Sequence, residues 1–226
     1  MRHDFKSVSV PPALSGCPKD KRGYPIPFSV AIDRNGKPDF KVVDRNAAEE
    51  CIKRKLCALS GKRFEHLTSE NGGYWFIGGP KSAFDQYGAY LDLPVRAECG
   101  RYALRVCPFL AIPGMAMHGN LEKSQARMDD NYVVQQNDTV IPDQPDIFVF
   151  VQATKYEIIQ TENGVLYKPH APYRRVEFWK DGSQIDFQQA RELSNDVPQT
   201  DEELKRWCKK LPKQTRTTPT RRVSVP

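Results

Sequence analysis

Two short motifs constrain the fold more than any other feature of this chain. Cys57-Ala-Leu-Ser60-Gly61 has the form of a Cys-x-x-Cys-Gly turn that binds zinc, with Ser60 in place of the second cysteine. Arg96-Ala-Glu-Cys99 has the form of a His-x-x-Cys pair at the start of a helix, with Arg96 in place of the histidine. Structural zinc takes about four Cys, His or carboxylate ligands in a closed tetrahedron, and these motifs supply Cys57 and Cys99. The layout therefore predicts a fold built on a turn and a helix, and it argues against the metal ion.

Length and cysteine usage indicate one intracellular domain with appendages. A chain of 226 residues can bury one sizeable core. No stretch approaches the ~18 apolar residues of a membrane span, and the N-terminal Met1-Arg-His-Asp-Phe5 lacks the apolar core of a signal peptide. Six cysteines scattered through a chain of this size are typical of reduced thiols. We therefore expect a cytoplasmic protein with no membrane partner.

The net charge of +6 is unevenly distributed. Residues 204–226 carry eight basic and no acidic side chains, whereas residues 1–203 carry 26 basic and 28 acidic ones, a net of −2. A basic tail suits polyphosphate or acidic partners, although many such tails are only solvated. The candidate nucleic-acid contacts in the tail are Lys209, Lys210, Arg216, Arg221 and Arg222.

Turn and capping signals place the elements of the N-terminal half. Asn35-Gly36 supplies the positive φ angles of a tight hairpin turn. Asp44 can cap a helix whose apolar residues recur at helical spacing. We expect, in order, an irregular arm over residues 1–23, a hairpin of 28–33 and 40–43, a helix over 46–59 ended by Gly61, a strand over 74–77 and a helix over 94–107.

The second half has a long loop and then alternating strands and helices. Asn163-Gly164 predicts another hairpin turn, and Thr200 with Glu203 forms a capping box. We expect a loop insertion over 111–146 with one short helix near 120–130, strands over 147–151, 156–159, 165–167 and 174–180, and helices over 186–194 and 200–210. Residues 24–199 then form a single domain, and residues 200–226 form a basic helix and tail.

Several short segments together carry a family resemblance: Asp20-Lys-Arg-Gly-Tyr-Pro-Ile-Pro27, Gly36-Lys-Pro-Asp-Phe40, Phe76-Ile-Gly-Gly-Pro80, Glu98-Cys-Gly-Arg-Tyr-Ala103, Cys107-Pro-Phe-Leu110, Val165-Leu-Tyr167 and Phe178-Trp-Lys-Asp-Gly182. They resemble an uncharacterised family of bacterial and phage proteins whose members carry Cys-x-x-Cys-Gly and His-x-x-Cys. The resemblance implies a treble-clef arrangement, and it implies no activity. The expected fold class is α+β, with a treble-clef-like core of knuckle, hairpin and helix, additional antiparallel β-hairpins and a C-terminal helix.

Other residues do not rebuild the zinc site at a usual spacing. Cys99 and Cys107 are eight residues apart on one predicted helix, about 12 Å by the helical rise, so they cannot share a zinc ion at ~2.3 Å. His66 and Glu98 match no common ligand spacing. Buried free cysteine behaves as a small hydrophobe. We therefore expect neither metal nor other cofactor, and Cys57 and Cys99 are the weak candidates should zinc be retained.

The enzymatic alternative is a divalent-metal-dependent nuclease of the His-Asn-His type, or an inactive relic of one. Glu65-His66 is followed by Gly72-Gly73, as an acidic-His pair and a Gly-Gly pair follow the knuckle in such enzymes. In that chemistry His66 would act as general base while a second residue holds the cation. The predicted helix offers no His or Asn for that second role.

A basic patch beside the knuckle is the second candidate surface for nucleic acid. It comprises Lys53, Arg54, Lys55, Lys62 and Arg63. Tyr74 or Trp75 could add a stacking ring, but neighbouring residues of a strand face opposite sides. A solvated helix face with Trp75 in the core is the favoured interpretation.

The predicted function is that of a non-enzymatic, phage-type accessory protein that contacts nucleic acid or a host protein. Salt-sensitive binding lost on removal of residues 204–226 would indicate the tail. A salt-insensitive protein partner would indicate the loop over 111–146. Cleavage of DNA that depends on His66 would indicate the nuclease.

Overall fold

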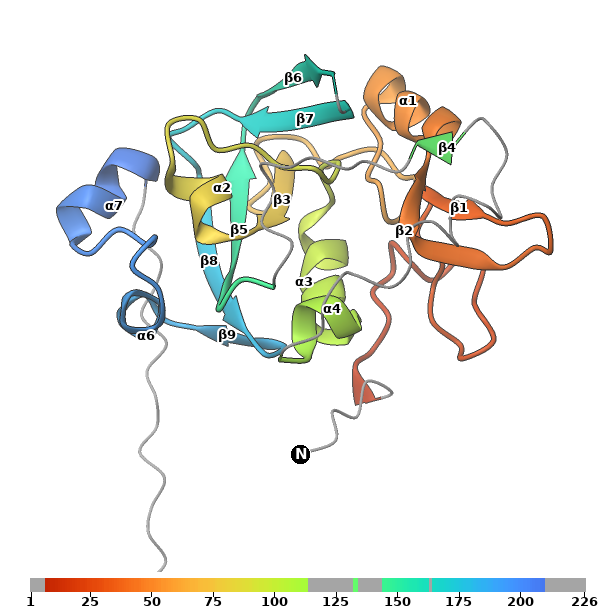
Figure 1. Ribbon diagram of the computed structural model, residues 1–226, viewed down its shortest axis with the longest axis horizontal. Coiled ribbons are helices and arrows are strands. Elements are labelled where there is room, and N and C mark those ends of the chain that lie inside the picture. The colour runs from red at the N-terminus through yellow and green to blue at the C-terminus, as the bar shows by residue number, and fades with distance from the viewer. Residues whose placement is uncertain (1–6, 114–131, 134–143, 163, 210–226) are drawn as a thin grey trace, which may run out of the picture.

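The computed structural model describes residues 7–113, 132–133, 144–162 and 164–209. Its centre is an antiparallel four-stranded sheet in the order β3-β5-β8-β9 (Figure 1). All six residues of β5 are buried, which explains why it reads as a continuous apolar run. The strands are β3 Tyr74–Gly78, β5 Phe148–Ala153, β8 Arg175–Lys180 and β9 Ser183–Ile185. Together with the helices they make an α+β fold, as predicted, and β9 is an addition to the expected strands.

The helix α3, Ala97–Val106, packs against this sheet through Gly100. A Cβ atom at Gly100 would lie 2.3 Å from Cζ of Phe150, so glycine allows the close approach. The helix begins three residues later than predicted, because Val95 exchanges two backbone hydrogen bonds with Trp75 of β3. Pro108 ends it as expected, and the one-turn α4, Pro108–Ala111, follows.

The N-terminal hairpin is confirmed. Strands β1, Val30–Ile32, and β2, Pro38–Asp44, pair antiparallel around Gly36, whose φ is +74°. A third strand, β4, Tyr132–Val133, pairs with β2 inside the segment predicted as a loop. The short helix expected near 120–130 lies outside the described residues.

The helix α1, Arg45–Arg54, is capped by Asp44 as predicted but ends five residues early. Lys55 takes a left-handed conformation with φ +54°, which stops the helix. Leu56 then bridges Arg63 in an antiparallel turn, and Gly61 serves this turn with φ +63° instead of ending the helix. The predicted C-terminal boundary of this helix was therefore wrong, because residues 56–63 form the turn that contains the Cys57 motif.

A two-stranded hairpin, β6 Tyr156–Thr161 and β7 Gly164–Pro169, lies beside the main sheet as predicted. A bridge between Tyr90 and Tyr167 attaches it to the chain after α2, Pro80–Phe84.

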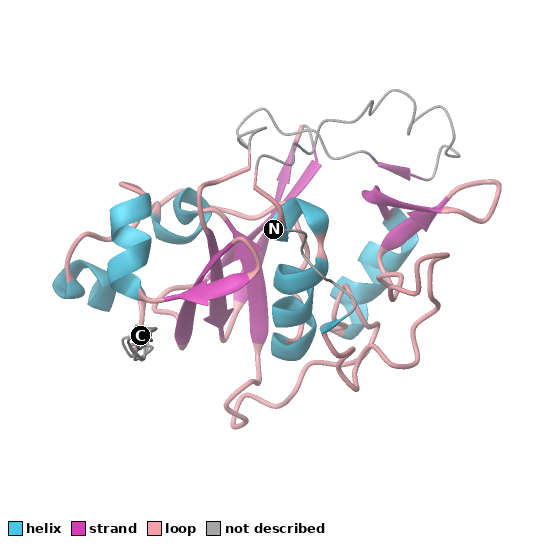
Figure 2. Cartoon of the chain, turned by 90° about the horizontal axis from the view of Figure 1, so that it is seen from below, coloured by secondary structure: helices cyan, strands magenta, loops and turns pink. Residues whose placement is uncertain are grey.

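Both C-terminal helices are confirmed, and so is the predicted capping box of the second one. Helix α6, Phe187–Leu193, begins at Asp186, and α7, Asp201–Trp207, begins with the Thr200–Glu203 capping box. Leu204 of α7 is fully buried, so α7 is part of the core. These helices lie at the opposite end of the molecule from β1, β2 and α1 (Figures 1 and 2).

The described part of the arm packs on the domain. Residues 8–29 run as turns with a bridge from Lys19 to Pro25, and Ala13 and Leu14 are buried. Among the described residues, no helix has both the length and the apolar character that crossing a membrane requires.

Candidate functional site

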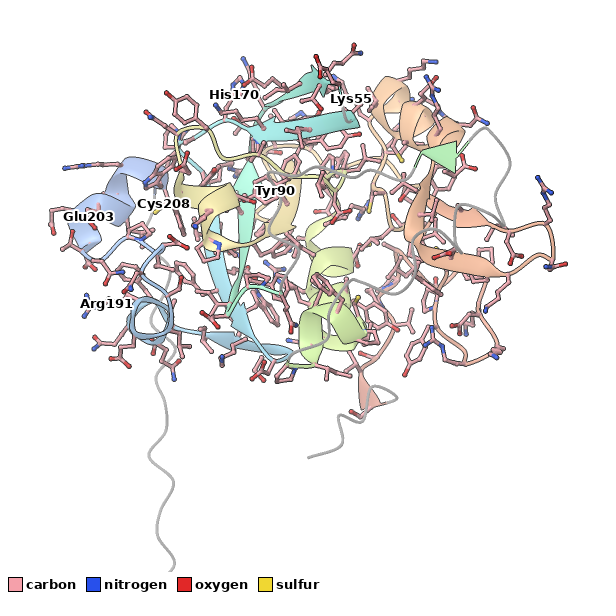
Figure 3. The ribbon with its side chains drawn as sticks, viewed as in Figure 1. Lys55, Tyr90, His170, Arg191, Glu203 and Cys208 are labelled. Carbon is pink, nitrogen blue, oxygen red and sulfur yellow. The ribbon has the colours of Figure 1, made fainter. Side chains whose placement is uncertain are left out.

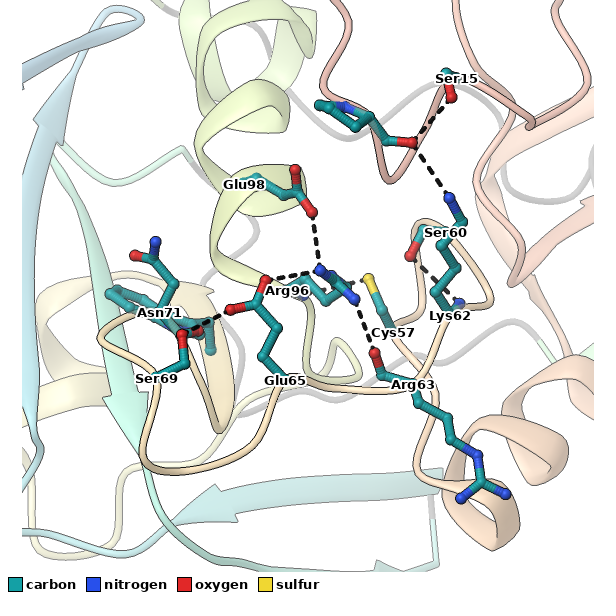
Figure 4. Close-up of polar contacts among 12 residues, drawn as sticks. Ser15, Cys57, Ser60, Lys62, Arg63, Glu65, Ser69, Asn71, Arg96 and Glu98 are labelled. Atoms are coloured by element: carbon teal, nitrogen blue, oxygen red, sulfur yellow. Dashed lines mark hydrogen bonds and ion pairs between the residues drawn. The ribbon is translucent and has the colours of Figure 1, made fainter.

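The structure brings together the four motif positions Cys57, Ser60, Arg96 and Cys99, which are called the knuckle positions below. Cys57 Sγ accepts a hydrogen bond from the backbone N–H of Arg96 at 3.2 Å. The side chains of Cys99 and Ser60 are close enough to Cys57 to lower its pKa. The turn itself is closed by the Gly61 N–H, which donates to the Cys57 carbonyl at 2.8 Å. Figure 4 shows Cys57 and Arg96, one residue from each motif, joined at the Cys57 sulfur atom.

This environment polarises the thiol pair. Burial alone would raise the pKa of Cys57, but hydrogen bonds from Cys99, Ser60 and the Arg96 N–H outweigh it and lower that pKa to about 6. The pKa of Cys99 is raised, because its thiol donates to Cys57 and because it is buried. Cys57 is therefore the more acidic thiol of the two. Within the described residues, no group of three or more His, Cys, Asp or Glu side chains is placed to hold a metal ion.

Arg96 links three segments from the place where a histidine ligand would stand. Its guanidinium pairs with Glu65 at 2.7 Å and with Glu98 at 3.1 Å, and it donates to the Arg63 carbonyl at 3.0 Å. Glu65 also accepts a hydrogen bond from Ser69 at 2.9 Å. Figure 4 shows this network surrounding the Cys57 turn. Ion pairs and hydrogen bonds therefore join the Cys57 turn, the loop before β3 and the start of α3.

The remaining cysteines behave as core thiols. All six are free. Burial raises the pKa of Cys51 to about 12 and that of Cys208 to about 11. A neutral thiol of this kind is a packing residue.

His66, the residue of the nuclease hypothesis, is exposed in the loop before β3. Its Nδ1 lies 3.0 Å from the hydroxyl of Thr68. A Cβ atom at Gly72 would lie 1.8 Å from the His66 carbonyl oxygen, and Gly73 has φ +89°. The Gly-Gly pair is therefore required by the tightness of this loop, which accounts for the motif without catalysis. Among the described residues, His66 belongs to no group of three or more His, Cys, Asp or Glu side chains that could hold a metal ion.

The predicted basic patch is divided by the structure. Lys53 pairs with Glu49 at 3.1 Å, and Arg54 pairs with Glu50, in both cases within α1. Lys62 donates to the Pro12 carbonyl at 3.2 Å. Lys55 and Arg63 remain together at the surface, because the Leu56–Arg63 bridge brings them to the same end of the turn. Lys55 lies where α1 ends (Figure 3).

Neither Tyr74 nor Trp75, the two rings considered for stacking, is available for it. Trp75 is fully buried and its Nε1 donates to the Asn71 carbonyl at 2.9 Å, as the favoured interpretation predicted. Tyr74 is half-buried, with its ring 4.8 Å from both Phe64 and Tyr156.

The N-terminal lobe, which we define as residues 7–63, is strongly basic. It has 12 Lys and Arg against six Asp and Glu, a net of +6, whereas residues 64–203 have 12 against 21, a net of −9. Three of the six lobe acids accept backbone N–H groups in turns or caps, namely Asp20, Asp33 and Asp44. The described residues of 64–203 alone carry 10 Lys and Arg against 16 Asp and Glu, a net of −6, so the near-neutral total is the sum of a basic N-terminal lobe and an acidic remainder.

One arginine and two aromatic rings form a cluster in this lobe that was not predicted from the sequence. The guanidinium carbon of Arg22 lies 5.4 Å from the ring centre of Tyr24 and 5.6 Å from that of Phe40. Phe40 is 46% exposed. The residues Arg22, Tyr24 and Phe40 are called the Arg22 cluster below. Arg22 and Tyr24 lie two positions apart, but the contact with Phe40 depends on how the turn folds against β2.

The tail falls mostly outside the described residues. Lys209 is exposed, and its N–H donates to the Tyr173 carbonyl at 2.7 Å. The other predicted tail contacts, Lys210, Arg216, Arg221 and Arg222, lie outside the described residues. Comparisons of the chain with protein-family models, with curated proteins and with solved structures found no match.

Proposed function

We propose that this chain is a non-enzymatic protein that binds nucleic acid through its N-terminal lobe. The observation that carries the proposal is the separation of charge, with a net of +6 over residues 7–63 beside a net of −6 over the described residues 64–113, 144–162 and 164–203. A polyanion is attracted to the first region and repelled by the second, so it meets the molecule in one orientation. The phage-type accessory role in the cytoplasm remains part of this proposal.

We further propose that the lobe is held to the sheet by a treble-clef-like core that has exchanged its metal for hydrogen bonds. The support is the convergence of Cys57, Ser60, Arg96 and Cys99, together with the ion pairs of Arg96. The knuckle precedes α3, which carries the second pair of positions in its first turn. In this account the Arg96 network fixes the knuckle turn, and so the end of the lobe, on α3.

The test is salt-dependent binding by the full chain. Fluorescence anisotropy with a labelled oligonucleotide should give an affinity that falls steeply with salt, because bound phosphates release counterions. A lobe variant that neutralises four exposed cations should bind roughly tenfold more weakly and with a smaller salt slope. The lobe variant is K21Q/K37Q/K55Q/R63Q, and the matched control at other sites is K155Q/K180Q/K205Q/R206Q.

Five outcomes are distinguishable. Loss of binding in the lobe variant alone supports the proposal, whereas equal loss in both variants reduces it to a general charge effect and contradicts it. Loss only on deletion of residues 210–226 moves the site to the tail. That deletion begins after Lys209, because removal from residue 204 would also remove the buried Leu204. Absence of nucleic-acid binding leaves the host-protein partner, and cleavage of the probe would point to the nuclease.

A further inference from the structure

We propose that the Arg22 cluster is a nucleotide contact for single-stranded nucleic acid, in which Phe40 stacks on a base and Arg22 binds the neighbouring phosphate. This inference rests on the proposed function and gives it a strand type and a site. It uses residues outside both basic surfaces identified from the sequence.

Arg22 is held in place before any ligand arrives. Its Nε donates to Oδ2 of Asp20 at 2.7 Å. The other oxygen of Asp20 accepts the backbone N–H groups of Arg22 at 2.8 Å and Tyr24 at 3.0 Å. The Asp20 side chain is 6% exposed, whereas that of Arg22 is 52% exposed. The carboxylate therefore fixes one edge of the guanidinium and leaves its other nitrogens toward solvent, which is the arrangement that a phosphate needs.

Phe40 provides an aromatic surface on the same cluster. It is 46% exposed, although burying a phenylalanine side chain normally stabilises a protein by about 1.5–3 kcal/mol. Ile32, 39% exposed, lies opposite Pro38 in the β1–β2 register, and Pro38 and Phe40 share a face of β2. An exposed ring with an apolar margin and a cation over it is the combination that proteins use to stack unpaired bases.

The charge of the lobe selects the partner. A protein or lipid surface could also cover an apolar ring, but the net of +6 in residues 7–63 is complementary to a polyphosphate chain. A single strand fits better than a duplex, because only an unstacked base can offer its face to Phe40.

The experiment compares a labelled oligothymidine strand with its duplex by anisotropy over a range of salt concentrations. Phe40→Ala in the full chain should weaken single-strand binding roughly tenfold with an unchanged salt slope, because stacking is not ionic. Phe40→Leu retains the apolar margin and should lose nearly as much. Arg22→Gln should weaken binding and reduce the salt slope by about one. The control is Tyr87→Ala, which removes an aromatic ring that is 81% exposed elsewhere and should bind as the parent does.

The failures of the two proposals differ. If oligonucleotides bind but the Phe40 variants bind as the parent does, or the duplex binds as tightly as the strand, this inference is overturned while the proposed function stands. If neither form of nucleic acid binds, both are overturned. Thermal melting of each variant establishes that lost binding does not reflect unfolding, since Phe40 is too exposed to carry much of the core.

Discussion

Arg96 makes the contacts that hold the Cys57 turn in the proposed metal-free core. Its backbone N–H donates to Cys57 at 3.2 Å, and its side chain pairs with Glu65 and Glu98. Because the side chain is only 19% exposed, these pairs are less screened than surface pairs. One arginine thereby connects the turn, the loop before β3 and the start of α3.

Replacing Arg96 should therefore destabilise the protein. Arg96→Met keeps the apolar stem, loses the guanidinium contacts and is expected to lower the free energy of unfolding by about 1–3 kcal/mol. Urea unfolding provides the measurement. Lys53→Met, which breaks an exposed pair with Glu49, should change that free energy by no more than about 0.5 kcal/mol. Equal effects of the two substitutions would contradict the assigned role.

The Cys57 thiol predicts a pH dependence of stability. Its pKa is lowered from the ordinary 9.0 to about 6. A group with a lowered folded-state pKa stabilises the fold above its unfolded pKa, and this contribution disappears as the pH falls through the folded value. The stability difference between the parent and Cys57→Ser should therefore widen as the pH rises from about 6 to about 9.

Cys51 provides the control for that pH series. Burial raises the pKa of Cys51 to about 12, so its neutral form is the folded form throughout this range. The stability difference between the parent and Cys51→Ser should not widen between pH 6 and 9. A flat difference for Cys57→Ser as well would show that Cys57 is a neutral thiol.

For single residues, sequence motifs predicted which positions would meet around Cys57, but they did not predict contacts that depend on the tertiary fold. Cys57 and Cys99 could be paired because motif spacing fixes their places on a turn and a helix. The Arg22–Phe40 contact could not be predicted, since it depends on how an irregular turn lies on β2. Burial of Trp75 followed from strand alternation, but the half-burial of Tyr74 by Phe64 and Tyr156 needed the tertiary fold.

Among the elements, α3 is the one whose position fixes the site. It carries Arg96 and Cys99 at its start, packs on β5 through Gly100 and is joined to β8 by the Arg101–Glu177 ion pair at 2.6 Å. Any shift of α3 away from the sheet moves two of the four knuckle positions.

Gly100→Ala tests that packing. Alanine favours a helix by about 1 kcal/mol over glycine, but the added Cβ would meet Phe150 at 2.3 Å and Val95 at 3.0 Å. We expect a net loss of about 1–3 kcal/mol in the free energy of unfolding, because the core is overpacked. Gly16→Ala, where no atom lies within 4 Å, should be close to neutral. A stabilised Gly100→Ala would show that α3 has room to move.

Element boundaries were predictable where a local signal decides them. Asp44 and Thr200 cap the helices that they were expected to cap. The end of α1 and the start of α3 were misplaced, because the Leu56–Arg63 bridge and the Trp75–Val95 pairing are tertiary contacts. Periodicity continued through both boundaries and gave no sign of them.

For the molecule as a whole, the proposed treble-clef core predicts that zinc binding can be restored. Ser60→Cys with Arg96→His would supply three thiolates and one imidazole around the place of Cys57, a common zinc set. Native mass spectrometry should then show one zinc per chain, and adding Cys57→Ser should abolish it. A double variant that folds without zinc would contradict the treble-clef geometry.

The distribution of charge is also a property of the whole molecule. The sequence totals placed the basicity in the tail, because the lobe and the remainder of the body nearly cancel when they are summed. The structure separates the N-terminal lobe from the helix that precedes the tail. Strands β1 and β2 and helix α1 lie at one end of the molecule, and α7 lies at the other (Figure 1). The two basic regions can therefore be tested independently.

Hydrogen–deuterium exchange of the full chain, with and without a single-stranded oligothymidine, is the most direct test of the central claim. Binding through the N-terminal lobe predicts slower exchange in the peptides that cover the Asp20–Tyr24 turn and the β1–β2 hairpin, with α6 and the β6–β7 hairpin unchanged. Protection confined to the C-terminal peptides, or no protection at saturating oligonucleotide, would contradict binding through the N-terminal lobe.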